Sequence, residues 1–382
     1  MREKNLLLCG RNILKIEHNI FCAGEKKGIN MSNNYGLKLS GYDYLGKQEQ
    51  EGIRYAWKYS NKPYLVESAA FQQKSKAPIC RADMEICGYT TSVNLGCILR
   101  PIGLSCRFCR TGNKLPFGGI LTAKDIAKQN ILMVLMDMAS DNIRRKNNAR
   151  EFAYMGQGEP GYSYPQIRKA INLTNFVMDY LGQKVHRHLI STSGIIEMID
   201  AYKNDLKNNY YTSRVTMHYS LHAFANREQI MPIEKLYPCK DVLNSLYHIR
   251  ELSGEKPCIG IIMFKNYRDS KNTDINFTNN IITLEEIAQN LDPERVRISL
   301  CEFNNTDIGY SEKISKKEWE IYLNLFKERG FEVKFFSSVG REKNSACGML
   351  GGKEPDIKID EIVEKIECEA ENLINKCMDR VP

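Results

Sequence analysis

The sequence predicts an α/β fold in which parallel strands are joined by helical crossovers. Short apolar runs alternate with segments whose apolar residues recur at helical spacing, from about residue 121 to residue 336. Polar, glycine-rich or ionisable residues follow the end of each predicted strand, and in α/β barrels the catalytic groups lie at that rim. We therefore expect an α/β architecture containing a partial (β/α)6 barrel.

The individual elements are predicted from their periodicity. The expected strands are residues 64–71, 151–155, 188–191, 214–220, 258–264, 295–300 and 331–336. The expected helices are residues 121–135, with Thr122 as N-cap, 164–180, 242–252, 284–291 and 316–329. The cysteine-rich stretch described below is expected to follow the first of these strands.

The chain divides into three parts by composition. Residues 1–63 form an N-terminal extension with turn-rich sequence and one short predicted helix, at about 49–59. The Lys, Arg and Tyr residues of the extension suit RNA binding, although a solvated surface fits them equally well. Residues 64–352 form the barrel with its loops, and residues 353–382 contain a charged amphipathic closing helix.

The composition indicates a cytoplasmic, metal- or thiol-using protein. The chain has 382 residues, 42% of them hydrophobic, so it is long enough to bury a full core. It shows no apolar run of membrane-spanning length and no secretory signal. Thirteen cysteines, an odd number, indicate reduced thiols and not a disulfide scaffold. The net charge of +8 is compatible with a nucleic-acid partner, but many enzymes are as basic.

The most informative stretch holds three cysteines, Cys97, Cys106 and Cys109, within thirteen residues. Thiolates spaced this closely on a turn can converge on one metal centre. Three ligands suit a [4Fe–4S] cluster with one open iron, because a closed structural zinc site requires four. An open iron can bind S-adenosylmethionine (SAM) and transfer an electron to it, which starts radical chemistry.

The cysteine spacing leaves alternatives open. Isolated cysteines are often small buried hydrophobic residues, and the Cys106–Cys109 pair also fits a zinc knuckle or a redox dithiol. The gap between Cys97 and Cys106 is eight residues, where the common radical-SAM pattern has three. Residues 100–103 are expected to bulge out of this gap and leave the ligands in place.

In order along residues 64–352, these motifs resemble the RlmN/Cfr family of radical-SAM RNA methyltransferases. The cysteine stretch resembles the family's cluster loop, which implies Cys97, Cys106 and Cys109 as ligands of the cluster. Four further motifs match the family: Met-Gly-Gln-Gly-Glu-Pro at 155–160, Ser-Thr-Ser-Gly at 191–194, Ser-Leu-His-Ala at 220–223 and an asparagine at 304. They imply that SAM is bound by Gly158, Glu159, Ser191, Ser220, Leu221, His222 and Asn304.

The resemblance also implies two residues that act in the reaction. Ala346-Cys347-Gly348 resembles the family's Ala-Cys-Gly, whose cysteine is methylated by one SAM and carries the methyl group. A second SAM, cleaved at the cluster, activates that S-methyl group for addition to an electron-poor adenine carbon. Glu67 resembles the family's general-base glutamate, and the alternative is a solvent-exposed carboxylate at a strand edge.

The position of the family's second catalytic cysteine, which resolves the enzyme–RNA adduct, is ambiguous in this chain. Counting seven residues back from Cys97 leads to Thr90, whereas counting thirteen forward from Glu67 leads to Cys80. Cys87 lies between them. We favour Cys80, with Cys87 second.

The resemblance implies methylation of carbon 2 or carbon 8 of an adenine in ribosomal or transfer RNA. The implied cofactors are a [4Fe–4S] cluster and SAM, and the implied partners are RNA and an electron donor such as flavodoxin or ferredoxin. We expect a cytoplasmic monomer with no membrane contact. One alternative is a radical-SAM enzyme with the same core that acts on a peptide or small molecule. A second is a zinc-binding protein that interacts with RNA.

Overall fold

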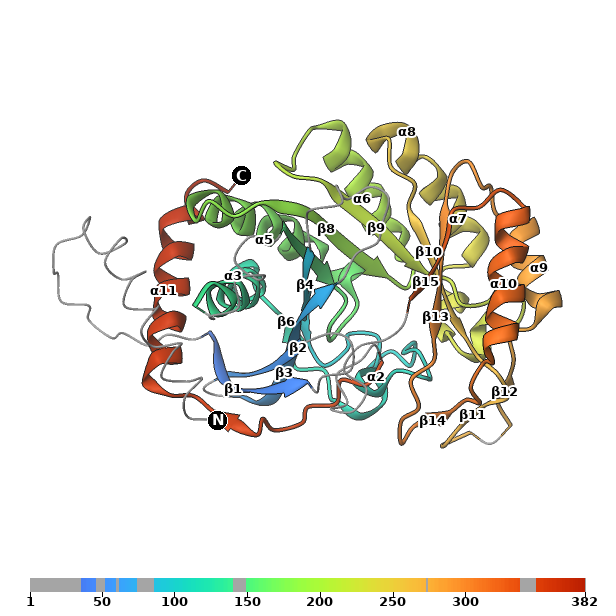
Figure 1. The fold of residues 1–382 in the computed structure, drawn as a ribbon, viewed down its shortest axis with the longest axis horizontal. Coiled ribbons are helices and arrows are strands. Elements are labelled where there is room, and N and C mark those ends of the chain that lie inside the picture. Colours follow the sequence, from blue (N-terminus) through green and yellow to red (C-terminus); the bar gives the residue numbers. More distant parts are fainter. Residues whose placement is uncertain are drawn as a thin grey trace, which may run out of the picture.

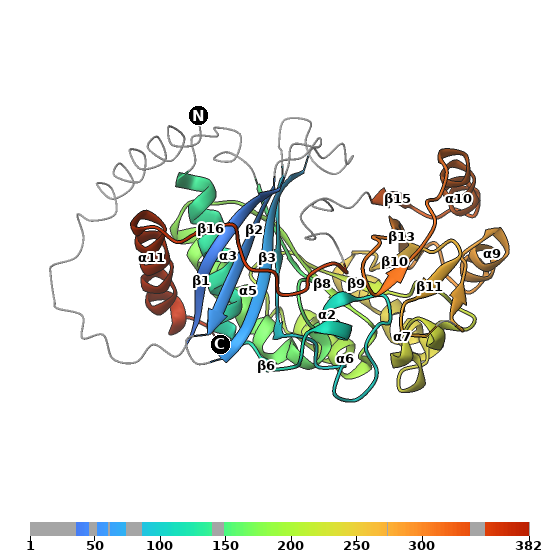
Figure 2. The ribbon, with the colours of Figure 1, turned by 90° about the horizontal axis from the view of Figure 1, so that it is seen from below.

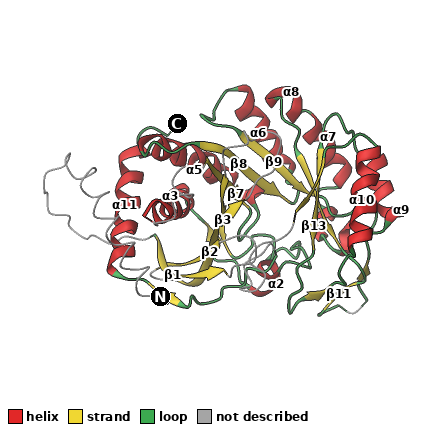
Figure 3. Cartoon of the chain, in the orientation of Figure 1, coloured by secondary structure: helices red, strands yellow, loops and turns green. Residues whose placement is uncertain are grey.

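The structure of the protein is a computed structural model that describes residues 36–45, 52–59, 62–73, 86–139, 149–272, 274–336 and 348–381. A large eleven-stranded sheet runs through the molecule, and two small sheets accompany it. Figure 1 shows helices on one side of the large sheet and around its far edge. Figure 3 separates helices, strands and connecting loops by colour.

The elements have the following bounds. The strands are β1 (Leu37–Leu45), β2 (Gly52–Tyr59), β3 (Lys62–Gln73), β4 (Ile86–Thr91), β5 (Asn94–Leu95), β6 (Gly119–Ile120), β7 (Ala149–Tyr154), β8 (Val185–Thr192), β9 (Val215–Ser220), β10 (Cys258–Met263), β11 (Tyr267–Asp269), β12 (Asn276–Phe277), β13 (Arg297–Glu302), β14 (Gly309–Tyr310), β15 (Val333–Phe336) and β16 (Ile357–Lys358). The helices are α2 (Arg110–Lys114), α3 (Ala123–Ala139), α5 (Pro160–Tyr180), α6 (Ile196–Lys207), α7 (Cys239–Tyr247), α8 (Ile249–Ser253), α9 (Ile281–Gln289), α10 (Lys316–Glu328) and α11 (Glu361–Met378), with short 3-10 turns η2 (Arg227–Gln229) and η3 (Pro232–Lys235).

The parallel half of the large sheet follows the predicted alternation of strands and helices. Its strand order is β4-β7-β8-β9-β10-β13-β15, and every neighbouring pair is parallel. Helices α3, α5, α6, α7, α9 and α10 lie between successive strands of this half in the sequence, as crossovers require, and of these only α6 was not among the predicted helices. The mixed α/β fold with a large sheet is thus confirmed.

The antiparallel half, β1-β2-β3 with β16 at the edge, differs from the prediction in three ways. Residues 52–59 are a buried strand, not a short helix, because they pair with β1 and β3 on both sides. Strand β3 is antiparallel to both β2 and β4 and so does not start the parallel half. The cysteine stretch follows β4, a short strand that contains Gly88 and that periodicity alone did not reveal.

The N-terminal and C-terminal segments are integrated into this sheet. The expected boundary at residue 63 falls inside β3, which hydrogen-bonds to β2 along its length. Helix α11 packs against α3, and buried Lys128 of α3 forms ion pairs with Glu367 and Glu371 of α11 at 2.6 Å. Figure 2 shows α3 and α11 on one side of β1–β3, and α2 on the other. The division into three parts stays a prediction, and residues 1–35 lie outside the described part of the chain.

The two faces of the large sheet carry different side chains. The face towards α3 and α5 bears buried aromatic residues such as Tyr89, whose hydroxyl donates to Asp137 of α3 at 2.7 Å. The opposite face, here called the inner face, bears Arg54, Thr90, Ser191 and His218, because directly paired residues share a face. In the part of the chain that is described, no helix is long and apolar enough to span a membrane.

Candidate active site

The cysteine stretch forms a loop closed at its base by a two-stranded sheet. Strand β5 pairs with β6, and the Leu121 amide donates to the Val93 carbonyl at 3.0 Å. The residues of the long first gap form a compact turn in which the Gly103 amide donates to Arg100 at 3.0 Å and the Leu104 amide to Leu99 at 3.0 Å. Ile102 at the tip is 54% exposed, so the extra residues bulge outward as expected.

Two side chains organise the part of the loop that carries Cys106 and Cys109. The Asn113 amide donates to the carbonyls of Cys106, Arg107 and Cys109 at 3.0, 3.0 and 2.8 Å. Phe108 is buried and packs against His222 and Phe264, with ring centroids 5.2 and 5.3 Å apart. Asn113 was not identified from the sequence, because its role appears only once the loop has turned back on itself.

The three cysteine thiols lie within electrostatic reach of one another. Burial raises the pKa of the Cys97 thiol to about 12, and the neighbouring Cys109 and Glu159 raise it too. Burial also raises the pKa of Cys106, with contributions from Cys109 and Cys97, and that of Cys109. Three adjacent thiolates would therefore be costly without a bound cation. The donor set fits an iron–sulfur cluster with cysteine ligands.

A single metal ion fits this loop less well. No three His, Cys, Asp or Glu side chains among the described residues lie close enough to share one ion. A structural zinc site requires four ligands that converge on one point, whereas the thiolates of an iron–sulfur cube bind different irons.

Gly158 and Glu159 hold the loops at the ends of β4, β7 and β8 together. Gly158 has φ +108°, and a Cβ atom there would lie 2.3 Å from Oδ1 of Asn94, so only glycine fits. The Glu159 carboxylate caps α5 and accepts from the Gly161 amide at 2.9 Å, the Thr192 hydroxyl at 2.6 Å, and the Ser193 amide and hydroxyl at 2.9 and 2.7 Å. Because a carboxylate accepts about four hydrogen bonds, Glu159 is fully occupied by this chain's own donors.

The other residues expected to bind SAM lie at the carboxyl ends of neighbouring strands. Ser191 is the last residue but one of β8 and Ser220 ends β9, and both are partly exposed on the inner face. Leu221 is fully buried, and its amide donates to Gly260 at 3.1 Å. Asn304 follows β13 and is 7% exposed. The fold thus brings the strand-end motifs to one edge of the sheet.

His222 links the cysteine loop to β10. Its backbone is left-handed at φ +61°, and its Nδ1 atom accepts from the Ile262 amide at 3.1 Å. Burial and nearby Arg227 lower the pKa of His222 to about 3, so the ring is neutral and its proton lies on Nε2. His222 is therefore a structural support for Phe108 as well as a residue of the strand-end motif.

A buried arginine that the sequence did not reveal joins the ends of β8 and β9. Arg227 is fully buried and donates to the carbonyls of Leu221, Ser193 and Ser220 at 2.9, 2.9 and 3.0 Å. Glu234 balances its charge at 2.7 Å. From sequence alone, an arginine in a turn is expected to lie on the surface. Only the position of Arg227 between two strand ends shows that it is buried.

The segment that follows Cys347 runs back to the cysteine loop. The Arg110 amide, one residue after Cys109, donates to the Gly348 carbonyl at 2.9 Å. The Thr111 hydroxyl donates to the Leu350 carbonyl at 2.8 Å. We call residues 348–356 the strap. Cys347 itself lies outside the described residues.

Glu67 is buried beside the strap and is not the solvent-exposed carboxylate considered as an alternative. It is 1% exposed, pairs with Arg54 at 2.6 Å, and accepts from the Gly352 amide at 2.7 Å and from Gln157 at 3.2 Å. The sequence identified Glu67 but not Arg54.

The described cysteine on β4 faces away from this site. Cys87 is buried beside Tyr89, on the face covered by helices, whereas Thr90 lies on the inner face opposite Ala69. Alternate residues of a strand point to opposite faces, so Cys87 does not reach the site and its assignment as a second resolving candidate is wrong. Cys80 lies outside the described residues, and its role stays a prediction.

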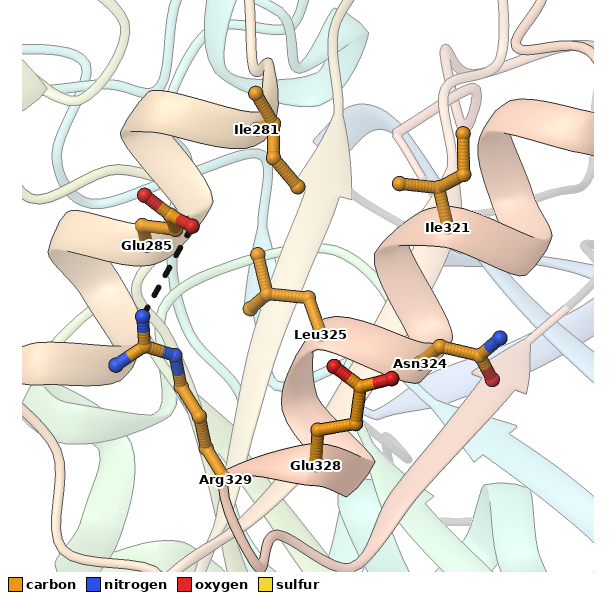
Figure 4. A pocket seen from close by; sticks show the side chains of 7 residues that line it. All are labelled: Ile281, Glu285, Ile321, Asn324, Leu325, Glu328 and Arg329. Atoms are coloured by element: carbon orange, nitrogen blue, oxygen red, sulfur yellow. Dashed lines mark ion pairs between the residues drawn. The ribbon is translucent and has the colours of Figure 1, made fainter.

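A groove that lies away from these motifs runs between α9 and α10 (Figure 4). Its volume is about 350 Å³, and Ile281, Ile321 and Leu325 line it beside the Glu285–Arg329 ion pair of 3.9 Å. It holds none of the motif residues. A smaller cavity of about 160 Å³ lies beneath the strap and is lined by Lys58, Gly96 and Gly352 among others.

Comparison with known proteins identifies the family. No family model matches the chain. It is 30% identical over 273 residues to "Probable dual-specificity RNA methyltransferase RlmN" of Pseudothermotoga lettingae, covering 69% of each chain. It is 28% identical over 272 residues to the protein of the same name from Petrotoga mobilis, covering 70% of each, and 25% identical over 333 residues to that from Dictyoglomus turgidum, covering 84% of each.

A solved structure supports the same fold. The crystal structure of a radical SAM methyltransferase from Sphaerobacter thermophilus superposes with a TM-score of 0.63 at 18% identity, covering 82% of each chain. The chain therefore belongs to the RlmN/Cfr-like family of radical-SAM RNA methyltransferases.

Proposed function

We propose that this protein methylates carbon 2 or carbon 8 of an adenine in ribosomal or transfer RNA, with Cys347 as methyl carrier. The observation that carries the proposal is the hydrogen bond from the Arg110 amide to the Gly348 carbonyl, at 2.9 Å. It joins the residue after Cys109 to the residue after Cys347, although the two motifs lie far apart in the sequence. The names of the relatives supply the substrate class, RNA.

The cofactor-binding residues are those that the family resemblance implies, and their grouping at the strand ends supports the assignment. Cys97, Cys106 and Cys109 would hold a [4Fe–4S] cluster, and the strand-end motifs would hold SAM. When bound, the cluster supplies the electron that cleaves SAM and so starts radical chemistry. The parallel strands from β4 to β13 would form the partial (β/α)6 barrel, with their inner face towards these groups.

The chain's own residues would act as follows. The Cys347 thiolate attacks the methyl carbon of a first SAM: the new sulfur–carbon bond forms as the sulfonium–carbon bond breaks, and S-adenosylhomocysteine leaves. Glu67 would accept the proton lost from the adenine carbon. Three donors hold its carboxylate and a carboxylate accepts about four hydrogen bonds, so one lone pair remains for that proton.

Labelled SAM tests the methyl-carrier role. Reconstituted protein is incubated anaerobically with methyl-labelled SAM, digested and analysed by mass spectrometry. We expect a gain of about 14 Da plus the extra mass of the isotope on the Cys347 peptide, no label in Cys347→Ala, and unchanged label in Cys368→Ala, an exposed cysteine of α11. Equal labelling of Cys347→Ala would contradict the proposal.

Two further measurements, of SAM cleavage and of metal content, separate the proposed function from its alternatives. RNA-dependent SAM cleavage that weakens with salt supports an RNA substrate. Cleavage that responds to a peptide or small molecule instead favours the same core with another substrate. A colourless zinc protein after anaerobic purification would support the zinc-binding alternative, whereas a brown protein with iron excludes it. The electron donor, the monomeric state and the cytoplasmic location stay predictions.

A further inference from the structure

Arg54 on β2 is fully buried at the back of the strap, and every N–H of its guanidinium group is used. Nε and Nη2 donate to Asp43, and Nη1 donates to Glu67 at 2.6 Å. Nη1 also donates to the Lys353 carbonyl at 2.7 Å, and Nη2 to the Glu354 carbonyl at 3.1 Å. These five hydrogen bonds exhaust the donors of an arginine.

The two carboxylates beside Arg54 complete the attachment of the strap. Glu67 accepts the Gly352 amide at 2.7 Å, and Asp43 accepts the Asp356 amide at 2.6 Å. Each carboxylate is 1% exposed and binds Arg54 on one side and the strap backbone on the other. We call Asp43, Arg54 and Glu67 the clamp. It holds four backbone groups of the strap from three neighbouring strands.

The chemistry of the clamp indicates that it fixes the position of the strap and does not only stabilise the fold. Three charges buried together gain little over well-packed apolar residues of the same volume, because their desolvation offsets their attraction. Apolar side chains, however, cannot fix the direction of backbone N–H and C=O groups. The clamp does so for residues 352–356, while Arg110 and Thr111 of the cysteine loop hold Gly348 and Leu350. Both ends of the strap are therefore fixed.

We propose that Arg54 is a positioning residue, which sets where the strap and the Glu67 carboxylate stand relative to the cysteine loop. The inference rests on the proposed function, because the strap begins directly after Cys347. Loss of the clamp would release the strap at its far end and free Glu67 from its fixed orientation. Methyl transfer would then slow because the carrier and the base no longer hold one geometry.

The chain provides a matched control on the same strand. Lys58 of β2 also reaches the strap, through an ion pair with Glu354 at 2.6 Å, but the two side chains are 46% and 59% exposed. An exposed pair of this kind contributes little. Lys58→Met therefore removes a charged link between β2 and the strap without touching the clamp.

Hydrogen–deuterium exchange of the full-length protein tests whether the clamp holds the strap. Arg54→Lys keeps the charge but offers too few donors to reach all partners, and Asp43→Asn leaves the Arg54–Glu67 pair in place. In Arg54→Lys we expect the Gly352 and Asp356 amides to exchange about tenfold faster or more, and in Asp43→Asn we expect this of the Asp356 amide, with the amides of α5 still protected in both. Lys58→Met should exchange as the unaltered protein does. Unchanged strap exchange in both clamp variants would overturn the proposal.

Methyl labelling of Cys347 tests the consequence for the reaction. In Arg54→Lys we expect labelling to slow about tenfold or more while iron content and the KM for SAM stay unchanged. If the strap of Arg54→Lys exchanges faster but Cys347 is labelled as fast as in the unaltered protein, the positioning role is overturned. If Cys347 of the unaltered protein takes up no label, the proposed function fails, and the exchange measurement still decides whether the clamp holds the strap.

Discussion

The antiparallel and parallel halves of the large sheet bury polar groups in different ways. In the antiparallel half, Asp43, Arg54 and Glu67 are buried as full charges that bind one another and the strap. In the parallel half, His188 and His222 are buried with pKa values lowered to about 3, so they are neutral, and both nitrogens of His188 have hydrogen-bond partners. The first arrangement depends on ion pairing and the second on remaining uncharged. The two halves should therefore respond differently to substitution and to pH.

The largest effect is expected from removing the central charge of the antiparallel half. Arg54→Met leaves two buried carboxylates without a counter-charge, which should lower the free energy of unfolding by about 3–5 kcal/mol. Urea unfolding under anaerobic conditions measures the change. A loss below about 1 kcal/mol would mean that the clamp is not buried in solution.

A smaller loss is expected in the parallel half from Glu159→Gln. The substitution replaces one acceptor oxygen by an NH2 group among four donors, and hydrogen bonds to charged groups are the strong ones, so the loss should be about 2–3 kcal/mol. Glu361→Gln, an exposed residue in the first turn of α11, is the control and should change stability by a few tenths of a kcal/mol at most. If the two variants lose equal free energy of unfolding, the four hydrogen bonds to Glu159 do not stabilise the fold as proposed.

The neutral histidines predict a pH dependence. Burial lowers the pKa of His188 and His222 from 6.5 to about 3, so their contribution is present above pH 6.5 and is lost as the pH falls towards 3. At pH 5 each should have lost about 2 kcal/mol. Unfolding measured at pH 7.5 and pH 5 checks the loss. His188→Gln should lower this difference, whereas His248→Gln, at an exposed site, should leave it unchanged.

The smallest effect is expected from Lys58→Met. The Lys58–Glu354 pair is exposed on both sides, so the free energy of unfolding should change by about 0–0.5 kcal/mol. The variant separates burial from charge, because it lies on the same strand as Arg54 and faces the same strap. A loss comparable with that of Arg54→Met would show that exposure does not distinguish the two pairs.

The parallel half was largely predictable because its signals are local. The apolar runs of β7 to β13 and the periodicity of α3, α5 and α10 lie within single elements, and the predicted segments match them closely. Strand β4 escaped prediction because it is short and contains a glycine. Residues 52–59 were misassigned because this strand is paired on both sides and buried on both faces from residue 52 to residue 57, so it lacks the alternation of apolar and polar residues.

The sequence by itself determined the family, the cysteine loop and the order of the strand-end motifs, because each of these is carried by a few neighbouring residues. Tertiary structure alone decided that Arg54 and Asp43 join Glu67, that Cys87 faces the helices, and that the strap returns to Arg110. Those facts depend on pairing register and on contacts between distant segments. From sequence alone, a charged side chain is expected to lie on the surface, and only the fold shows whether a partner of opposite charge allows it to be buried.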